Sequence, residues 1–275
     1  MNNRLTAPVL IREEGDAGRS TPAAFSGGAI IGALGGLIGL GGAEFRLRLL
    51  ISTFRFGALQ AVILKAMSLV VVASALPFRA TAVPFISVAA HWPIIVNLLA
   101  GSLLGAWFGA SWATRLASQT LHRVIAGLLL GIAVVLALGH DAAATGAMLT
   151  GSAQMVAGVT AGFIIGIVAA LLGVAGGELL IPTLVLLFGA DIKLAGSLSL
   201  AVSLPTMLVG FAHYSRDRSF LVLAENRRFM LVMAAGSIFG SFIGGRLLGL
   251  VPNAVLLPLL AIILVLSAVK VWRHG

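Results

Sequence analysis

The sequence contains no cysteine, which excludes disulfide bonds, thiol catalysis and thiolate metal sites. Charge is also scarce: only 10% of the 275 residues are charged, against about 25% in a typical soluble domain. By contrast, 59% of the residues are hydrophobic and the mean hydropathy is +1.09. These values predict a polytopic membrane protein that has the lipid bilayer as its solvent.

The few polar residues exclude several other classes of protein. The net charge of +9 does not indicate nucleic-acid binding, because the basic residues fall at the ends of apolar runs, where they orient a membrane protein. The histidines are not spaced as metal ligands, and no glycine-rich loop carries the Lys-Ser/Thr of a nucleotide site. We therefore expect no enzyme, no metal and no cofactor. Residues 1–22 are polar and predict a disordered cytoplasmic tail without a signal peptide.

Most of the apolar runs after this tail are long enough to span a membrane as a helix. Two runs, 45–54 and 179–189, are too short to cross, and each directly follows a glycine cluster. A short apolar segment of this kind is typical of a re-entrant or half-helix element. The longer runs are 24–42, 58–78, 91–113, 121–139, 152–174, 194–213, 228–249 and 253–271.

The chain also repeats itself. A shift of 134 residues places glycines and one glutamate of the first half on those of the second, and a shift of 135 matches a later glycine-rich run. We therefore predict two transmembrane repeats, over 23–140 and 150–272. The matched pairs are Gly28 and Gly162, Gly32 and Gly166, Gly39 and Gly173, Gly42 and Gly176, Glu44 and Glu178, Gly101 and Gly236, Gly105 and Gly240, and Gly109 and Gly244.

The positions of lysine and arginine bear on how the two repeats are oriented. If only the long runs cross, the repeats are parallel, and the basic residues divide poorly between the two sides of the membrane. If each short run completes a crossing, the repeats are inverted and most basic residues gather on one side, which the positive-inside rule favours. Both alternatives place the two termini on the cytoplasmic side. Inverted repeats with broken helices near the midplane are a transporter architecture.

The most informative stretch is residues 173–182, in which three glycines, Glu178 and Pro182 interrupt the apolar sequence. In lipid, backbone can leave the helix only where protein or a water-filled cavity satisfies its polar groups. Glycine permits such a break, and we interpret Pro182 as marking the first turn of a restarted helix. Backbone N–H groups at a helix start can bind an anion. The predicted substrate-binding backbone therefore comprises Gly41, Gly42, Gly176 and Gly177.

Glycine also has a purely structural use, which is to let two helices pack closely. This is the alternative for the glycines at the two breaks. It is our interpretation for the glycines at every fourth position in 101–109 and 236–244.

Glu44 and Glu178 are the only carboxylates within the apolar segments. A buried carboxylate can exchange a proton near neutral pH, so both are candidates for substrate binding and for carrying a coupling proton. Alternatively, each lies at a half-helix N-terminus, where free N–H groups and the helix dipole stabilise its charge. Glu44 can also pair with Arg48, four residues later.

Lys65 lies inside an apolar run, where its ammonium group must reach the substrate, a carboxylate or the lipid headgroups. Its counterpart in the second repeat is Ser199, which together with Ser197 can offer hydroxyls to an anion. The alternative for the serines is a hydrogen bond to the preceding helical turn. We count Lys65, Ser197 and Ser199 among the candidate substrate-binding residues.

Arg46 and Arg48 are the least expected residues, because they interrupt the short apolar segment of the first repeat. They can complete an anion site through bidentate contacts. Alternatively, they face the cytoplasm, if this segment barely enters the bilayer. Both interpretations stay open at the level of the sequence.

Taken together, these features resemble the TauE/SafE family of sulfite exporters and related anion permeases. The resemblance rests mainly on the glycine-rich break and proline at 173–182 and on the small residues and serines that follow over 188–199. It extends over nearly all of the chain after the tail. The first repeat keeps the glycines of 39–42 but then departs from the pattern, with Arg48 at the position of Pro182.

The resemblance implies an all-helical membrane protein with two homologous halves, each of about four long helices and one short half-helix. It implies a secondary permease in the cell (inner) membrane for a small anion, a sulfur-containing one such as sulfite or an organosulfonate. We expect alternating access, coupled to a proton or another ion gradient. The alternatives are an uncoupled, channel-like anion facilitator and a membrane scaffold.

Overall fold

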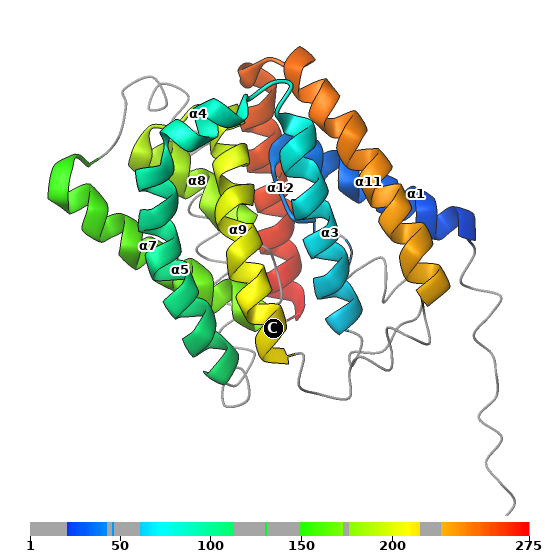
Figure 1. Cartoon of the computed structure of the whole chain (residues 1–275), viewed down its shortest axis with the longest axis horizontal. Coiled ribbons are helices and arrows are strands. Elements are labelled where there is room, and N and C mark those ends of the chain that lie inside the picture. Colours follow the sequence, from blue (N-terminus) through cyan, green and yellow to red (C-terminus); the bar gives the residue numbers. More distant parts are fainter. Residues whose placement is uncertain are drawn as a thin grey trace, which may run out of the picture.

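A computed structural model describes residues 21–42, 46, 61–112, 130, 149–172, 176–214 and 227–274. Throughout these residues the regular structure is helical, without strands, which confirms the all-helical prediction (Figure 1). The helices are α1 (Thr21–Ile38), α3 (Ala61–Arg79), α4 (Phe85–Ala90), α5 (Trp92–Trp112), α7 (Gly151–Leu172), α8 (Gly177–Phe188), α9 (Ile192–Tyr214), α11 (Arg227–Leu250) and α12 (Asn253–His274).

Five of these helices, α1, α5, α7, α9 and α11, are long and apolar enough to cross a membrane. Shorter apolar stretches occupy Ser68–Arg79, Gly177–Phe188 and Asn253–Leu266. Large hydrophobic side chains are exposed on the outer faces, including Ile30, Trp107 and Leu231. Such a surface suits lipid rather than water, and the prediction of a polytopic membrane protein is confirmed. The predicted runs 45–54 and 121–139 lie outside the described residues except at Arg46 and Leu130.

Two parallel helix pairs, α1 with α11 and α5 with α7, make the most extensive contacts. Glycines bring the backbones of each pair together. A Cβ added to Gly32 would lie 2.1 Å from the Ser237 carbonyl oxygen, and one added to Gly166 would lie 2.2 Å from that of Ser102. These two contacts are equivalent under the repeat shift. Each pair therefore joins one helix from the first half of the chain to one from the second.

The same glycine packing extends along both pairs. It confirms the structural role predicted for the glycines at every fourth position, since a Cβ at each would lie within 3 Å of a backbone carbonyl oxygen on the partner helix. These glycines are Gly101, Gly105, Gly109, Gly236, Gly240 and Gly244.

Helices α3 and α9 lie side by side near the centre of the molecule and run antiparallel (Figure 1). Arg79 at the end of α3 contacts Ser197 near the start of α9, whereas Val72, earlier in α3, packs with Leu200, further along α9. Under the repeat shift these two helices are counterparts.

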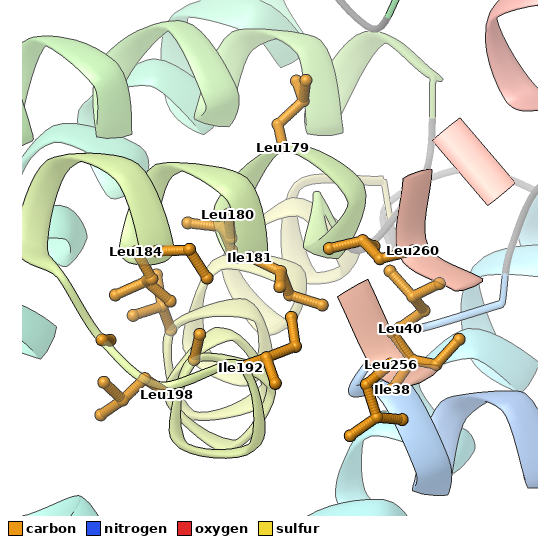
Figure 2. Packing of buried hydrophobic residues seen from close by; sticks show 14 of the residues in the cluster. Ile38, Leu40, Leu179, Leu180, Ile181, Leu184, Ile192, Leu198, Leu256 and Leu260 are labelled. Atoms are coloured by element: carbon orange, nitrogen blue, oxygen red, sulfur yellow. The ribbon is translucent and has the colours of Figure 1, made fainter. Parts of the chain in front are cut away.

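The short helix α8 is enclosed within the molecule, and most of its residues are buried. Leu180, Ile181 and Leu184 pack into the main apolar cluster, together with side chains from α1, α9 and α12 (Figure 2). This position surrounds the start of α8 with protein, as irregular backbone within a membrane requires.

Candidate functional site

The glycine break of the second half lies between α7 and α8. Helix α7 ends at Leu172 and α8 begins at Gly177, preceded by Gly176 in the left-handed conformation (φ 70°, ψ 0°). Only glycine adopts this conformation without strain, so Gly176 fixes the direction in which α8 starts. The structure thus confirms a short helix after the glycine cluster, 12 residues long, ending at Gly189.

The sequence interpretation of Pro182 is wrong. Pro182 does not mark the first turn of the restarted helix but lies inside α8, five residues after its first residue. A proline there removes the N–H that would bond to the carbonyl oxygen of Glu178. The restart is set by the left-handed glycine instead, and this buried helix accommodates the proline.

The corresponding break of the first half follows the end of α1. The chain leaves the helix after Ile38, with Gly39 (φ 96°) and Gly42 (φ 65°) both in conformations that favour glycine. Gly41 and Gly42 are buried. The break predicted from the glycine cluster is therefore present, although the segment after it is described only at Arg46.

The two breaks lie against each other in the interior. A Cβ on Gly177 would lie 3.2 Å from the carbonyl oxygen of Gly39 and 3.4 Å from the Cα of Leu40. Helix α9 also contacts the first break, because the Ser199 hydroxyl donates to the Gly39 carbonyl at 3.0 Å. The end of α1, the start of α8 and the start of α9 thus converge on one buried point.

Glu178 is the second residue of α8 and exposes only 6% of its surface. The N–H groups of Leu179 and Leu180 both turn back to the Gly176 carbonyl, at 3.0 and 2.9 Å. That of Gly177 has no backbone acceptor within the described part of the chain. The first turn of α8 therefore combines a buried carboxylate with the positive end of a helix dipole, which suits either an anion or a proton-exchanging acid.

Ser197 and Ser199 are both buried and hydrogen-bonded. Ser197 accepts from Nε of Arg79 at 3.0 Å and donates to the Lys193 carbonyl at 3.3 Å. Ser199 shares its proton between the carbonyls of Gly39 and Gly196, the second at 2.9 Å. The alternative of bonding to the preceding turn is thus observed for both serines, alongside contacts to other elements.

Arg79 is a buried residue near these serines whose burial the sequence does not reveal. Its guanidinium is fully buried and donates to the carbonyls of Gly36 at 2.8 Å, Leu37 at 2.9 Å and Lys193 at 2.7 Å. Carbonyls in the last turn of a helix lack intrahelical partners, so Arg79 supplies donors that the end of α1 needs. In the sequence, this arginine at the end of an apolar run looks like an ordinary interfacial residue.

Arg46 is also fully buried, which excludes the interpretation that it faces the cytoplasm. Its Nη1 and Nη2 groups donate to the hydroxyls of Ser68 on α3 and Ser237 on α11, both at 3.3 Å. Its Nε–H is buried and has no acceptor in the described residues.

The remaining predicted site residues are less completely placed. Glu44 and Arg48 lie outside the described residues. Lys65 belongs to α3, but its side chain is also outside them. The described residues contain no group of histidine and carboxylate side chains that could hold a metal ion.

Comparison with known proteins gives one match. The family described as "Sulfite exporter TauE/SafE" matches residues 24–271, nearly the whole chain. Searches of curated proteins and of solved structures found no match.

Proposed function

Because the chain belongs to the sulfite exporter TauE/SafE family, whose members transport sulfite and other anions across membranes, we propose that it is a secondary permease for a small sulfur-containing anion. Sulfite and organosulfonates are the substrates that this proposal names. The substrate site lies where the two glycine breaks meet, and helix pairs related by the repeat move relative to each other to give alternating access.

The observation that carries the proposal is the convergence of the two breaks in the protein interior. Irregular backbone at membrane depth is stable only where it is enclosed by protein or lines a cavity. Here Gly177 lies against Gly39 and Leu40, so the first turn of α8 lies in this region. A helix N-terminus carries a partial positive charge and attracts an anion without a charged side chain.

Charge in the interior also favours an anion. The described residues contain two fully buried guanidinium groups, those of Arg46 and Arg79, and one buried carboxylate, that of Glu178. Burying a charge without a partner is costly, so an excess of buried positive charge is best compensated by a negative ligand.

The packing supports alternating access by inverted repeats. Helices α3 and α9 are counterparts under the repeat shift and run antiparallel, as an inverted repeat requires. The pairs α1–α11 and α5–α7 each join the two halves through glycine contacts, so each pair can move as a unit. Relative movement of these units opens the site to one side of the membrane at a time.

The first experiment is ligand-induced stabilisation of the purified protein in detergent, with sulfite, sulfate, thiosulfate, taurine and chloride. A ligand that binds only the native state raises the melting temperature in a concentration-dependent way. We expect stabilisation by sulfur oxyanions or sulfonates, and its loss in Gly176→Leu, because the left-handed conformation at that position is unfavourable for leucine. Absence of stabilisation by every anion would contradict the proposal.

Glu178→Gln distinguishes a coupled permease from an uncoupled facilitator. The substitution keeps the size of the side chain but removes its proton exchange. If Glu178 carries the coupling proton, a pH gradient across proteoliposomes no longer drives uptake by the variant, although binding persists. A facilitator would transport the anion down its own gradient equally well with either residue.

A further inference from the structure

The two buried arginines differ in how completely the protein satisfies them. Arg79 donates to three backbone carbonyls and one hydroxyl, at distances from 2.7 to 3.0 Å. Arg46 donates only to the hydroxyls of Ser68 and Ser237, both at 3.3 Å, within the described residues. Arg79 therefore holds the fold together, whereas Arg46 keeps donors that a ligand can use.

The guanidinium group of Arg46 has more N–H bonds than the two serines use. Arginine carries five N–H bonds in a planar fork. Each Nη of Arg46 uses one N–H to reach a serine and keeps a second, and the buried Nε–H has no acceptor among the described residues. The Nε–H and the neighbouring Nη–H are nearly parallel. This edge matches two oxygens of a single oxyanion.

We propose that Arg46, Ser68 and Ser237 form a binding site for a singly charged oxyanion, which lies against the Nε edge of the guanidinium group. The inference rests on the proposed function, because it assigns the ligand of this site to the transported substrate. It adds the charge class of that substrate and the side chains that recognise it.

Charge matching determines the class of ligand. The three side chains carry one formal positive charge, so a singly charged ligand leaves a neutral complex inside the protein. A dianion such as sulfate would leave a net negative charge buried, which is strongly unfavourable. A sulfonate or bisulfite group carries one negative charge over several oxygens. Two of its oxygens can meet the guanidinium edge, and a third can accept from a hydroxyl.

The serines place this site between two helices. Ser68 lies on α3 and Ser237 on α11, and Arg46 follows the first glycine break. Ser237 accepts from Arg46 and can therefore donate its own O–H to the anion. An anion bound here would contact the segment after the first glycine break and one helix from each half of the chain. A substrate in this position can therefore change how these helices pack against each other.

The test uses the full-length protein in detergent and three small probes of similar shape. Methanesulfonate is a monoanion, sulfate is a dianion and dimethyl sulfone is neutral. We expect methanesulfonate to bind at least about tenfold more tightly than sulfate, and we expect the sulfone not to bind. Arg46→Lys should weaken methanesulfonate binding by about tenfold or more, because lysine keeps the charge but lacks the planar pair of N–H donors.

Matched serine variants separate a role in binding from a role in folding. Ser237→Ala and Ser241→Ala change the same residue type one turn apart on α11. The Ser241 hydroxyl bonds to Ser74 and to the Gly32 carbonyl rather than to Arg46. We expect Ser237→Ala to weaken methanesulfonate binding several-fold and Ser241→Ala to leave it unchanged.

The outcomes distinguish this inference from the proposed function. Tight binding of methanesulfonate that neither Arg46→Lys nor Ser237→Ala reduces would overturn the site and leave the permease proposal intact. Tighter binding of sulfate than of methanesulfonate would overturn the charge class. Failure of the wild-type protein to bind any sulfur oxyanion or sulfonate would instead contradict the proposed function itself.

Discussion

At the scale of single residues, the interior is organised by arginines whose burial the sequence does not reveal. Arg46 and Arg48 stand out in the sequence because they interrupt an apolar segment, whereas Arg79 ends a run as any interfacial arginine does. Whether an arginine is buried depends on which helix ends lie next to it in the folded protein. The carbonyls that bind Arg79 come from residues 36, 37 and 193, far from it in the sequence.

Arg79→Met is expected to destabilise the protein strongly. The substitution leaves three carbonyls without the donors that Arg79 gives them, and hydrogen bonds to charged groups contribute about 1.5–3 kcal/mol each. We expect a loss of about 3 kcal/mol or more, seen as a lower melting temperature in detergent without any added anion.

The matched control for this variant is Arg246→Met on α11. Arg246 is exposed and lies over the ring of Phe242, 5.4 Å from its centroid. An exposed contact of this kind contributes about 0.5–1 kcal/mol. Equal destabilisation by both substitutions would show that the hydrogen bonds of Arg79 do not stabilise the fold as argued.

At the scale of the elements, glycine spacing predicts more than any other signal. It locates the short helix α8 to within two residues and assigns the glycines at every fourth position to packing, as observed. The separate interpretation of Pro182 as a helix start is wrong, because a helix that protein surrounds can accommodate an internal proline. Glycine spacing also does not show which helices pack together, since a stripe of small residues fits any close partner.

Gly240→Ala and Gly249→Ala test this packing within one helix. A Cβ at Gly240 would lie 1.9 Å from the Ala29 carbonyl oxygen, so α1 and α11 must separate to accept it. A Cβ at Gly249 would meet only the Cβ of Ala82, at 4.0 Å. We expect Gly240→Ala to lower the melting temperature clearly. Gly249→Ala leaves it unchanged or raises stability by up to about 1 kcal/mol, because alanine favours the helix.

The measurement is thermal unfolding of both variants in the same detergent, together with the equivalent substitution Gly105→Ala in α5. A Cβ there would lie 2.0 Å from the Phe163 carbonyl oxygen, so its effect should match that of Gly240→Ala. If alanine is tolerated at both buried positions, the close approach of the two helix pairs is not needed for stability.

At the scale of the whole molecule, helices of one half pack against helices of the other half, so the two halves do not form separate domains. Helix α1 of the first half packs against α11 of the second, and α7 of the second half packs against α5 of the first. The contacts of these two pairs correspond under the repeat shift. The sequence predicts the repeat itself, because matched glycines and glutamates recur in order. The sequence does not predict that α1 packs on α11 and α5 on α7, because this pairing depends on how the halves fold onto each other.

Inverted repeats predict that equivalent residues lie on opposite sides of the membrane. Trp92 at the start of α5 and Arg227 at the start of α11 are equivalent under the shift of 135 and are both exposed. Because the protein has no cysteine, Trp92→Cys and Arg227→Cys each create a unique label site. A membrane-impermeant maleimide applied to intact cells should label the first variant only, since the positive-inside rule places Arg227 in the cytoplasm.

Permeabilised cells provide the control, because both variants should then react. Labelling of both or of neither in intact cells would mean that the repeats are parallel, and movement of helix pairs related by inversion would no longer explain transport.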